Sequence, residues 1–119
     1  MGDASFLLKN VSKIKAAAKN PSLSHAFREK IMSVVTAVNG CVYCSWFHTR
    51  EASAAGVSQA EIDDLFKLQY DTEADNFELP ALVYAQHFAE TGRNPDPQDT
   101  SAFVKYYGTK TAGEIMLFI

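Results

Sequence analysis

The 119-residue sequence lacks the features of several large classes of protein. No apolar run approaches the roughly 20 residues that a membrane-spanning helix requires, so we predict no membrane partner. The net charge of -3 argues against a surface that grips phosphate backbones, so we predict no nucleic-acid partner. The first residues have neither the basic nor the apolar segment of an export signal. We therefore expect a cytoplasmic location, in a reducing environment.

The sequence also lacks sustained alternation of apolar and polar residues, which is the pattern of a half-buried β-strand. It contains no internal repeat at solenoid spacing and no low-complexity segment. Apolar residues instead recur at spacings of three and four, as on the buried face of a helix. We therefore predict an all-α fold of about six to seven helices, in a single domain that spans residues 1–119.

The ends of the predicted helices follow from capping and breaking residues. The segment Ser58-Gln-Ala-Glu61 has the sequence of a capping box and is predicted to begin one helix. Thr111-Ala-Gly-Glu114 repeats this capping-box sequence near the C-terminus. Pro80 is acceptable only in the first turn of its helix. The predicted helices cover residues 4–19, from Ser22 or Ser24 to 39, 41–55, from 58 to about 68, 79–90, 98–106, and from 111 onward.

The last four residues, Met116 to Ile119, are all apolar. Three interpretations are open at this stage. The segment docks into another subunit, the chain has lost a longer terminal helix, or the segment packs as a short tail on the protein's own core.

Cysteine is scarce, and its two occurrences lie close together. Cys41 and Cys44 are followed by His48 in the spacing C-x-x-C-x-x-x-H. On the predicted helix these three side chains project from one face. A thiolate is favoured near a helix N-terminus, and His48 lies one turn beyond Cys44, where it is placed to exchange a proton. The pattern predicts a dithiol redox centre.

Two other interpretations of the cysteines stay open. They are small buried apolar residues, or they bind zinc together with His48. Zinc needs a fourth ligand, which a carboxylate such as Glu29 or another histidine would have to supply. Covalent haem is excluded, because Ser45 stands where that motif requires a histidine.

The spacing E-x11-C-x2-C-x3-H resembles the signature of the alkylhydroperoxidase D-like branch of the carboxymuconolactone decarboxylase family. Four residues make it: Glu29, Cys41, Cys44 and His48. Residues 39–44 and 82–92 are also similar to that family, and the resemblance covers roughly residues 23–118. It implies an all-helical fold, a thiol–disulfide centre and assembly into a homo-trimer or homo-hexamer.

The resemblance also implies roles for the four residues. Cys44 would be the thiol that attacks the peroxide, Cys41 its disulfide partner, and Glu29 and His48 a proton relay. Position alone leaves the order of the cysteines open, since Cys41 is nearer the helix N-terminus and Cys44 nearer His48. We expect no metal and no cofactor besides the Cys41–Cys44 disulfide. The expected partners are a hydroperoxide or disulfide substrate and an external dithiol, either a thiol reductant protein or a lipoyl-type dithiol.

Tyr43 departs from the pattern of the peroxidase members, which have a histidine just before the second cysteine. A phenol cannot replace an imidazole near neutral pH, so Tyr43 is expected to slow peroxide reduction while leaving disulfide exchange intact. The alternative functions are a carboxymuconolactone decarboxylase-type lyase and a zinc-binding or purely structural helical subunit. The lyases generally lack the cysteine pair, whereas zinc binding would depend on it.

Overall fold

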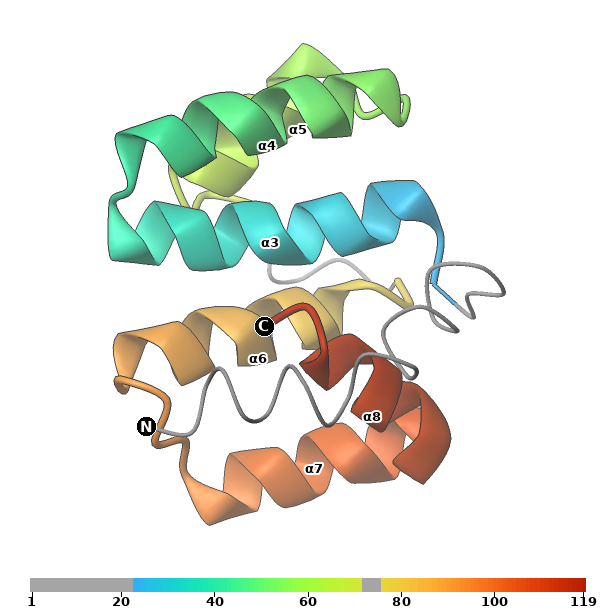
Figure 1. Ribbon diagram of the computed structural model, residues 1–119. Coiled ribbons are helices and arrows are strands. Elements are labelled where there is room, and N and C mark those ends of the chain that lie inside the picture. The colour runs from blue at the N-terminus through green and yellow to red at the C-terminus, as the bar shows by residue number, and fades with distance from the viewer. Residues whose placement is uncertain (1–22, 72–75) are drawn as a thin grey trace.

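The computed structural model describes residues 23–71 and 76–119, and in these ranges it contains helices and no strand (Figure 1). This confirms the all-α prediction. The predicted helix over residues 4–19 lies outside the described residues. The helices are α3 (His25–Asn39), α4 (Val42–Ala54), α5 (Gln59–Phe66), α6 (Leu79–Glu90), α7 (Pro97–Tyr107) and α8 (Thr109–Met116).

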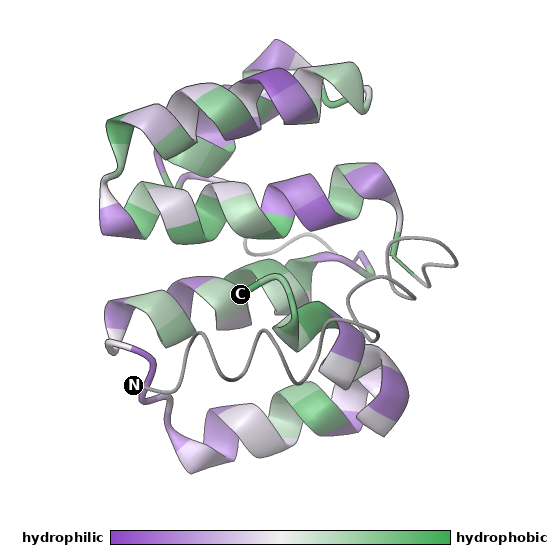
Figure 2. Cartoon of the chain, in the orientation of Figure 1, coloured by the Kyte–Doolittle hydropathy of each residue, from purple (hydrophilic) through white to green (hydrophobic). Residues whose placement is uncertain are grey.

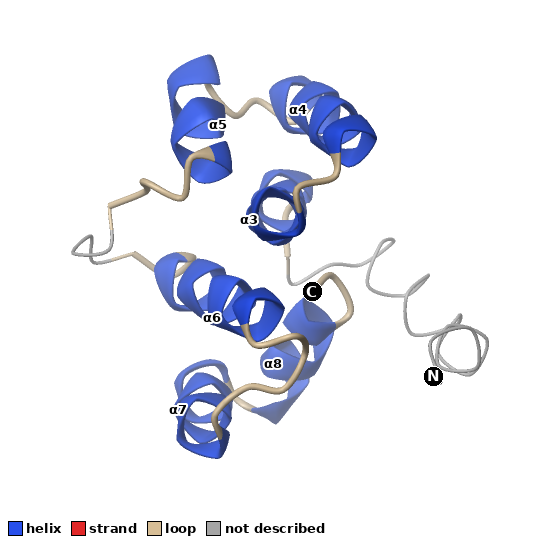
Figure 3. Ribbon diagram, turned by 90° about the vertical axis from the view of Figure 1, so that its left-hand side faces the viewer, coloured by secondary structure: helices blue, strands red, loops and turns tan. Residues whose placement is uncertain are grey.

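Helix α3 lies at the centre of the arrangement. It contacts α4 and α5 on one side and α6 on the other, while α7 contacts both α6 and α8. A view almost along the axis of α3 shows it between the α4–α5 pair and α6 (Figure 3). A residue of α3 that faces α4 therefore belongs to a helix that has neighbouring helices on both sides.

Most helices begin and end close to the residues predicted from the sequence. Ser24 Oγ accepts a hydrogen bond from the Phe27 N–H at 3.1 Å, and Ser58 Oγ accepts one from the Glu61 N–H at 3.2 Å. Each side chain satisfies a backbone donor that the first turn of a helix leaves unpaired. Of the two candidates, Ser24 is thus the cap of α3.

The predicted start of the last helix is wrong. Helix α8 begins at Thr109, with Gly108 as its N-cap, and Thr111 lies inside the helix. Gly108 has φ of +83° and ψ of 158°, a conformation that glycine alone adopts at little cost. This glycine lets the chain turn directly from α7 into α8, so the helix forms two residues before the capping-box sequence.

The main core joins α3 to α6, α7 and α8. Apolar residues recur along each helix rather than in one segment (Figure 2), and the buried ones meet between the helices. The largest fully buried side chains are Leu23, Ile31, Ile62, Leu65, Ile115 and Val34. A smaller cluster of Ala52, Val57 and Ile62 lies between α4 and α5. Helix α4 thus rests on α3 and α5 with little apolar burial of its own.

The apolar residues at the C-terminal end pack on the protein's own core. Met116, Phe118 and Ile119 are partly buried against the main cluster, and the Arg28 guanidinium lies 5.7 Å from the centre of the Phe118 ring. This segment therefore contacts the protein's own core.

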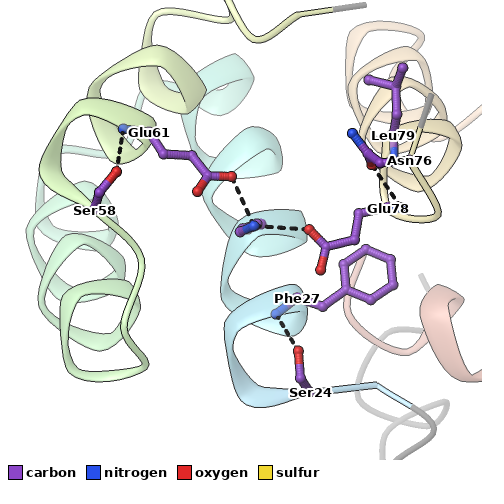
Figure 4. A network of polar contacts seen from close by, with 8 residues as sticks. Ser24, Phe27, Ser58, Glu61, Asn76, Glu78 and Leu79 are labelled. Atoms are coloured by element: carbon purple, nitrogen blue, oxygen red, sulfur yellow. Dashed lines mark hydrogen bonds and ion pairs between the residues drawn. The ribbon is translucent and has the colours of Figure 1, made fainter. Parts of the chain in front are cut away.

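An ion-pair network ties α3 to its neighbours. Glu61 of α5 and Glu78, just before α6, point toward each other (Figure 4), and Lys30 Nζ lies 2.8 Å and 2.9 Å from their carboxylates. Burial lowers the pKa of Lys30, but the two carboxylates outweigh it, and the net pKa is raised. The stabilisation from this raised pKa is present below the ordinary lysine pKa and is lost as pH rises through the folded-state value.

No helix in the described part of the chain is long and apolar enough to cross a membrane.

Tyr107 links the end of α7 to the start of α6. Its hydroxyl donates to the carbonyl oxygen of Phe77 and accepts from the N–H of Ala81 at 3.0 Å. Burial raises the pKa of Tyr107 well above its ordinary value, so the hydroxyl keeps its proton over the whole neutral range.

We predict that Tyr107→Phe lowers the free energy of unfolding by about 1–2 kcal/mol, because the Phe77 carbonyl and the buried Ala81 N–H each lose a hydrogen-bond partner. Urea denaturation measures this change. Tyr106→Phe is the matched control, since the Tyr106 side chain is 53% exposed. Equal stabilities of the two variants would contradict the prediction.

Candidate active site

The cysteine pair lies where α3 turns into α4. Gly40 ends α3 with φ of +74°, in the left-handed region, and its N–H donates to the Thr36 carbonyl oxygen at 2.9 Å. Cys41 is the N-cap of α4, and its Sγ accepts a hydrogen bond from the N–H of Cys44 at 3.2 Å. Helix α4 therefore begins one residue later than predicted, with a sulfur at its cap.

Cys41 and Cys44 form a disulfide, with their Cα atoms 5.3 Å apart. Both residues are partly exposed at the surface. The pair is therefore neither two isolated thiols nor part of the buried core, which excludes the interpretation as small buried apolar residues. A disulfide at this position is reachable by a reductant from solvent.

Glu29 and His48 meet across the interface of α3 and α4. Glu29 is only 2% exposed, and its two carboxylate oxygens lie 3.0 Å and 3.2 Å from Nδ1 of His48. The family resemblance implied that Glu29 and His48 act together as a proton relay, and the structure brings these two side chains together. A buried carboxylate without such a partner would be strongly destabilising.

This contact selects the nitrogen of His48 that can accept a proton. With Nδ1–H donated to Glu29, the lone pair of the neutral ring is on Nε2. His48 follows Cys44 by four residues on α4, so the two side chains emerge from the same face, one turn apart. The imidazole is thereby oriented on the face of α4 that also carries a sulfur.

Helix α4 also carries three aromatic side chains near the disulfide and His48 in sequence. The ring of Phe47 lies edge-on to the ring of His48, with 5.2 Å between their centres. Tyr43 is 71% exposed and Trp46 54% exposed, and their rings lie 6.0 Å apart. Tyr43 is thus a surface residue next to the disulfide, in contact with another aromatic ring rather than in the core.

Two neighbours of the site were not singled out from the sequence. Ser33, one turn beyond Glu29 on α3, is fully buried, and its hydroxyl has no hydrogen-bond partner among the described residues. Glu51, one turn beyond His48 on α4, lies 3.8 Å from Nε2 of His25. The spacing of Ser33 from Glu29 on α3, and of Glu51 from His48 on α4, was the signal that the sequence offered. The proximity of Glu51 to His25 depends on how α3 and α4 cross.

Comparison with known proteins identifies a family. A model of the Carboxymuconolactone decarboxylase family matches residues 7–87, which include Glu29, both cysteines and His48. Searches of curated proteins and of solved structures found no match.

Cys41 also caps α4, and this structural role can be tested separately from its chemistry. We predict that Cys41→Ser is more stable than Cys41→Ala by about 0.5–2 kcal/mol, because a serine hydroxyl keeps the cap and a methyl group does not. Both variants lack the disulfide, so each is the control for the other. Urea denaturation measures the difference, and equal stabilities would show that the cap is dispensable.

Proposed function

The chain belongs to the carboxymuconolactone decarboxylase family, and on that premise we propose that it is a thiol–disulfide oxidoreductase with peroxidase-like activity of the alkylhydroperoxidase D-like kind. One observation carries the proposal. A cysteine pair already joined as a disulfide precedes, by one helical turn, a histidine whose ring is held by a buried carboxylate. Such a triad of sulfur, base and orienting group is typical of an activated nucleophile.

In the first step, the reduced Cys44 loses its proton to Nε2 of His48, while Glu29 stabilises the resulting imidazolium. The thiolate attacks a hydroperoxide. An S–O bond forms, the O–O bond breaks, and the alkoxide leaves as an alcohol after taking the proton from His48. The sulfur is oxidised by two electrons to a sulfenic acid, and the peroxide is reduced by two.

In the second step, the thiol of Cys41 attacks the sulfur of the sulfenic acid. An S–S bond forms, the S–O bond breaks, and water leaves. The product is the Cys41–Cys44 disulfide, whose Cα separation of 5.3 Å is ordinary for such a bond. An external dithiol, from a thiol reductant protein or a lipoyl-type group, then exchanges with it and restores both thiols.

The order of the cysteines rests on His48 and on the family resemblance. Cys41 accepts the N–H of Cys44, which also favours a thiolate at Cys41. In our proposal this hydrogen bond makes Cys41 a good leaving group when the dithiol attacks the disulfide at Cys44. Tyr43 stands where peroxidase members of the family have a histidine, so in our proposal His48 is the base of the peroxide step.

The lyase activity in the family's name is the alternative. It would require a proton-donating pocket and no redox cysteines, so an observed disulfide favours the oxidoreductase. Zinc bound by Cys41, Cys44 and His48 is disfavoured in the state observed, because a disulfide has no thiolate to offer.

We further propose assembly into a homo-trimer or homo-hexamer and a cytoplasmic location. The apolar side chains that α4 exposes, among them Val42 at 84%, offer surface for contacts between subunits. A reducing compartment would supply the dithiol that the reaction consumes.

Single-turnover oxidation tests the proposal. One equivalent of an alkyl hydroperoxide should remove two thiols per reduced chain and yield one alcohol, and a dithiol should restore both thiols. Cys44→Ser should abolish this oxidation, whereas Cys41→Ser should stop at a sulfenic acid that dimedone traps. Intact thiols after peroxide treatment would contradict the proposal, and a block in Cys41→Ser alone would reverse the two roles.

A further inference from the structure

A second group of polar side chains lies beside the Glu29–His48 contact. One ligand atom from each of His25, Glu29 and Glu51 lies within 4.8 Å of the other two. His25 and Glu29 are four residues apart on α3, so they share a face, and Glu51 approaches them from α4. This group contains no sulfur, and it includes two residues outside the proposed redox machinery.

No lysine or arginine in the described part of the chain forms an ion pair with this group. Within residues 23–71 and 76–119, the ion pairs of Glu29 and Glu51 are made with histidines. The nearest basic residues in the sequence have contacts elsewhere: Arg28 with the Leu23 carbonyl and Phe118, Lys30 with Glu61 and Glu78, and Arg50 with Trp46. Two carboxylates therefore lie close together, an arrangement that a bound cation would stabilise.

The three residues combine one fixed and two adjustable ligands. Glu29 is buried and held by His48, whereas the side chains of His25 and Glu51 are 48% and 40% exposed. Bonds from a metal to nitrogen and oxygen ligands measure about 2.0–2.2 Å, so the ligand atoms must move somewhat closer together. The two exposed side chains can make this movement without disturbing the core.

The donor set indicates the class of ion. Imidazole nitrogen favours zinc and similar transition ions, and carboxylate oxygens accept the same ions, whereas calcium and magnesium prefer oxygen ligands alone. We propose that His25, Glu29 and Glu51 form a binding site for a divalent ion of the zinc type, with the remaining coordination positions filled by water. His48, whose Nδ1 lies 3.0 Å and 3.2 Å from the two oxygens of Glu29, orients that ligand as an outer partner.

This site is distinct from the zinc site that the cysteine spacing allows. Its ligands come from two helices and from positions 25, 29 and 51, a set whose spacing matches no zinc motif in the sequence. It needs no reduced thiol, so it should bind metal while the disulfide is closed. It also goes beyond the proposed oxidoreductase function and stands whether or not the peroxide reaction occurs.

Calorimetric titration of the oxidised full chain with ZnCl2 tests the site. We expect one ion per chain, and His25→Ala and Glu51→Gln should each weaken binding at least about tenfold, by analogy with the loss caused by removing even an outer-sphere partner. Both altered side chains are substantially exposed, so the variants should fold, and circular dichroism checks this.

Two controls make the result specific. Asp99→Asn is the matched change in another histidine–carboxylate pair, where Asp99 lies 3.2 Å from His87, and it should leave zinc binding unchanged. The double variant Cys41→Ser/Cys44→Ser should also bind zinc as the unaltered chain does. No binding up to about 1 mM zinc, a concentration that corresponds to about -4 kcal/mol of binding free energy, would overturn the proposal. Binding by His25→Ala or Glu51→Gln as tight as that of the unaltered chain, or loss of binding in the double cysteine variant, would also overturn it.

Discussion

The contact between Glu29 and His48 is the constraint on which the site depends. A carboxylate that is 2% exposed requires a donor, and the donor comes from the neighbouring helix. Helix α4 buries few apolar side chains, so apolar packing alone specifies its position weakly. The polar contact compensates by fixing which face of α4 turns toward α3. The cysteines and His48 share that helix, and their position is set along with it.

Helix α3 connects the core to this site. Successive residues of α3 serve different neighbours: Glu29 faces α4, Lys30 pairs with groups before α6 and on α5, and Ile31 is fully buried. Helix α3 therefore carries the carboxylate that orients His48, and it contacts neighbouring elements on both of its sides. A ligand held on such an enclosed element keeps its position while solvent-exposed partners move, which is what both the redox proposal and the metal proposal require.

Features that depend on local sequence were predictable. Ser24 and Ser58 signal helix starts through side chains that reach only three residues, and the cysteine pair is close in space because it is close in sequence. The start at Thr111 was wrong for a related reason. Its capping box is a real local signal, but Gly108 lets the chain enter the helix earlier, and sequence alone does not rank two competing starts.

Features that depend on helix crossing were not predictable in the same way. The meeting of Glu29 with His48 came from resemblance rather than from spacing, and the approach of Glu51 to His25 carries no signal in either helix alone. The exposure of Tyr43 and Trp46 was equally hidden, because α4 has apolar residues on several faces and no clear stripe.

A double-mutant cycle on the rate of disulfide formation tests most directly whether the Glu29–His48 pair serves the sulfur chemistry. The reduced chain, Glu29→Gln, His48→Gln and the double variant would each be oxidised by one hydroperoxide in stopped flow, with folding verified by circular dichroism. Because the two residues act through one contact, we predict that the double variant reacts about as slowly as the slower single variant. Rates equal to that of the unaltered chain, or independent effects that multiply in the double variant, would contradict this account.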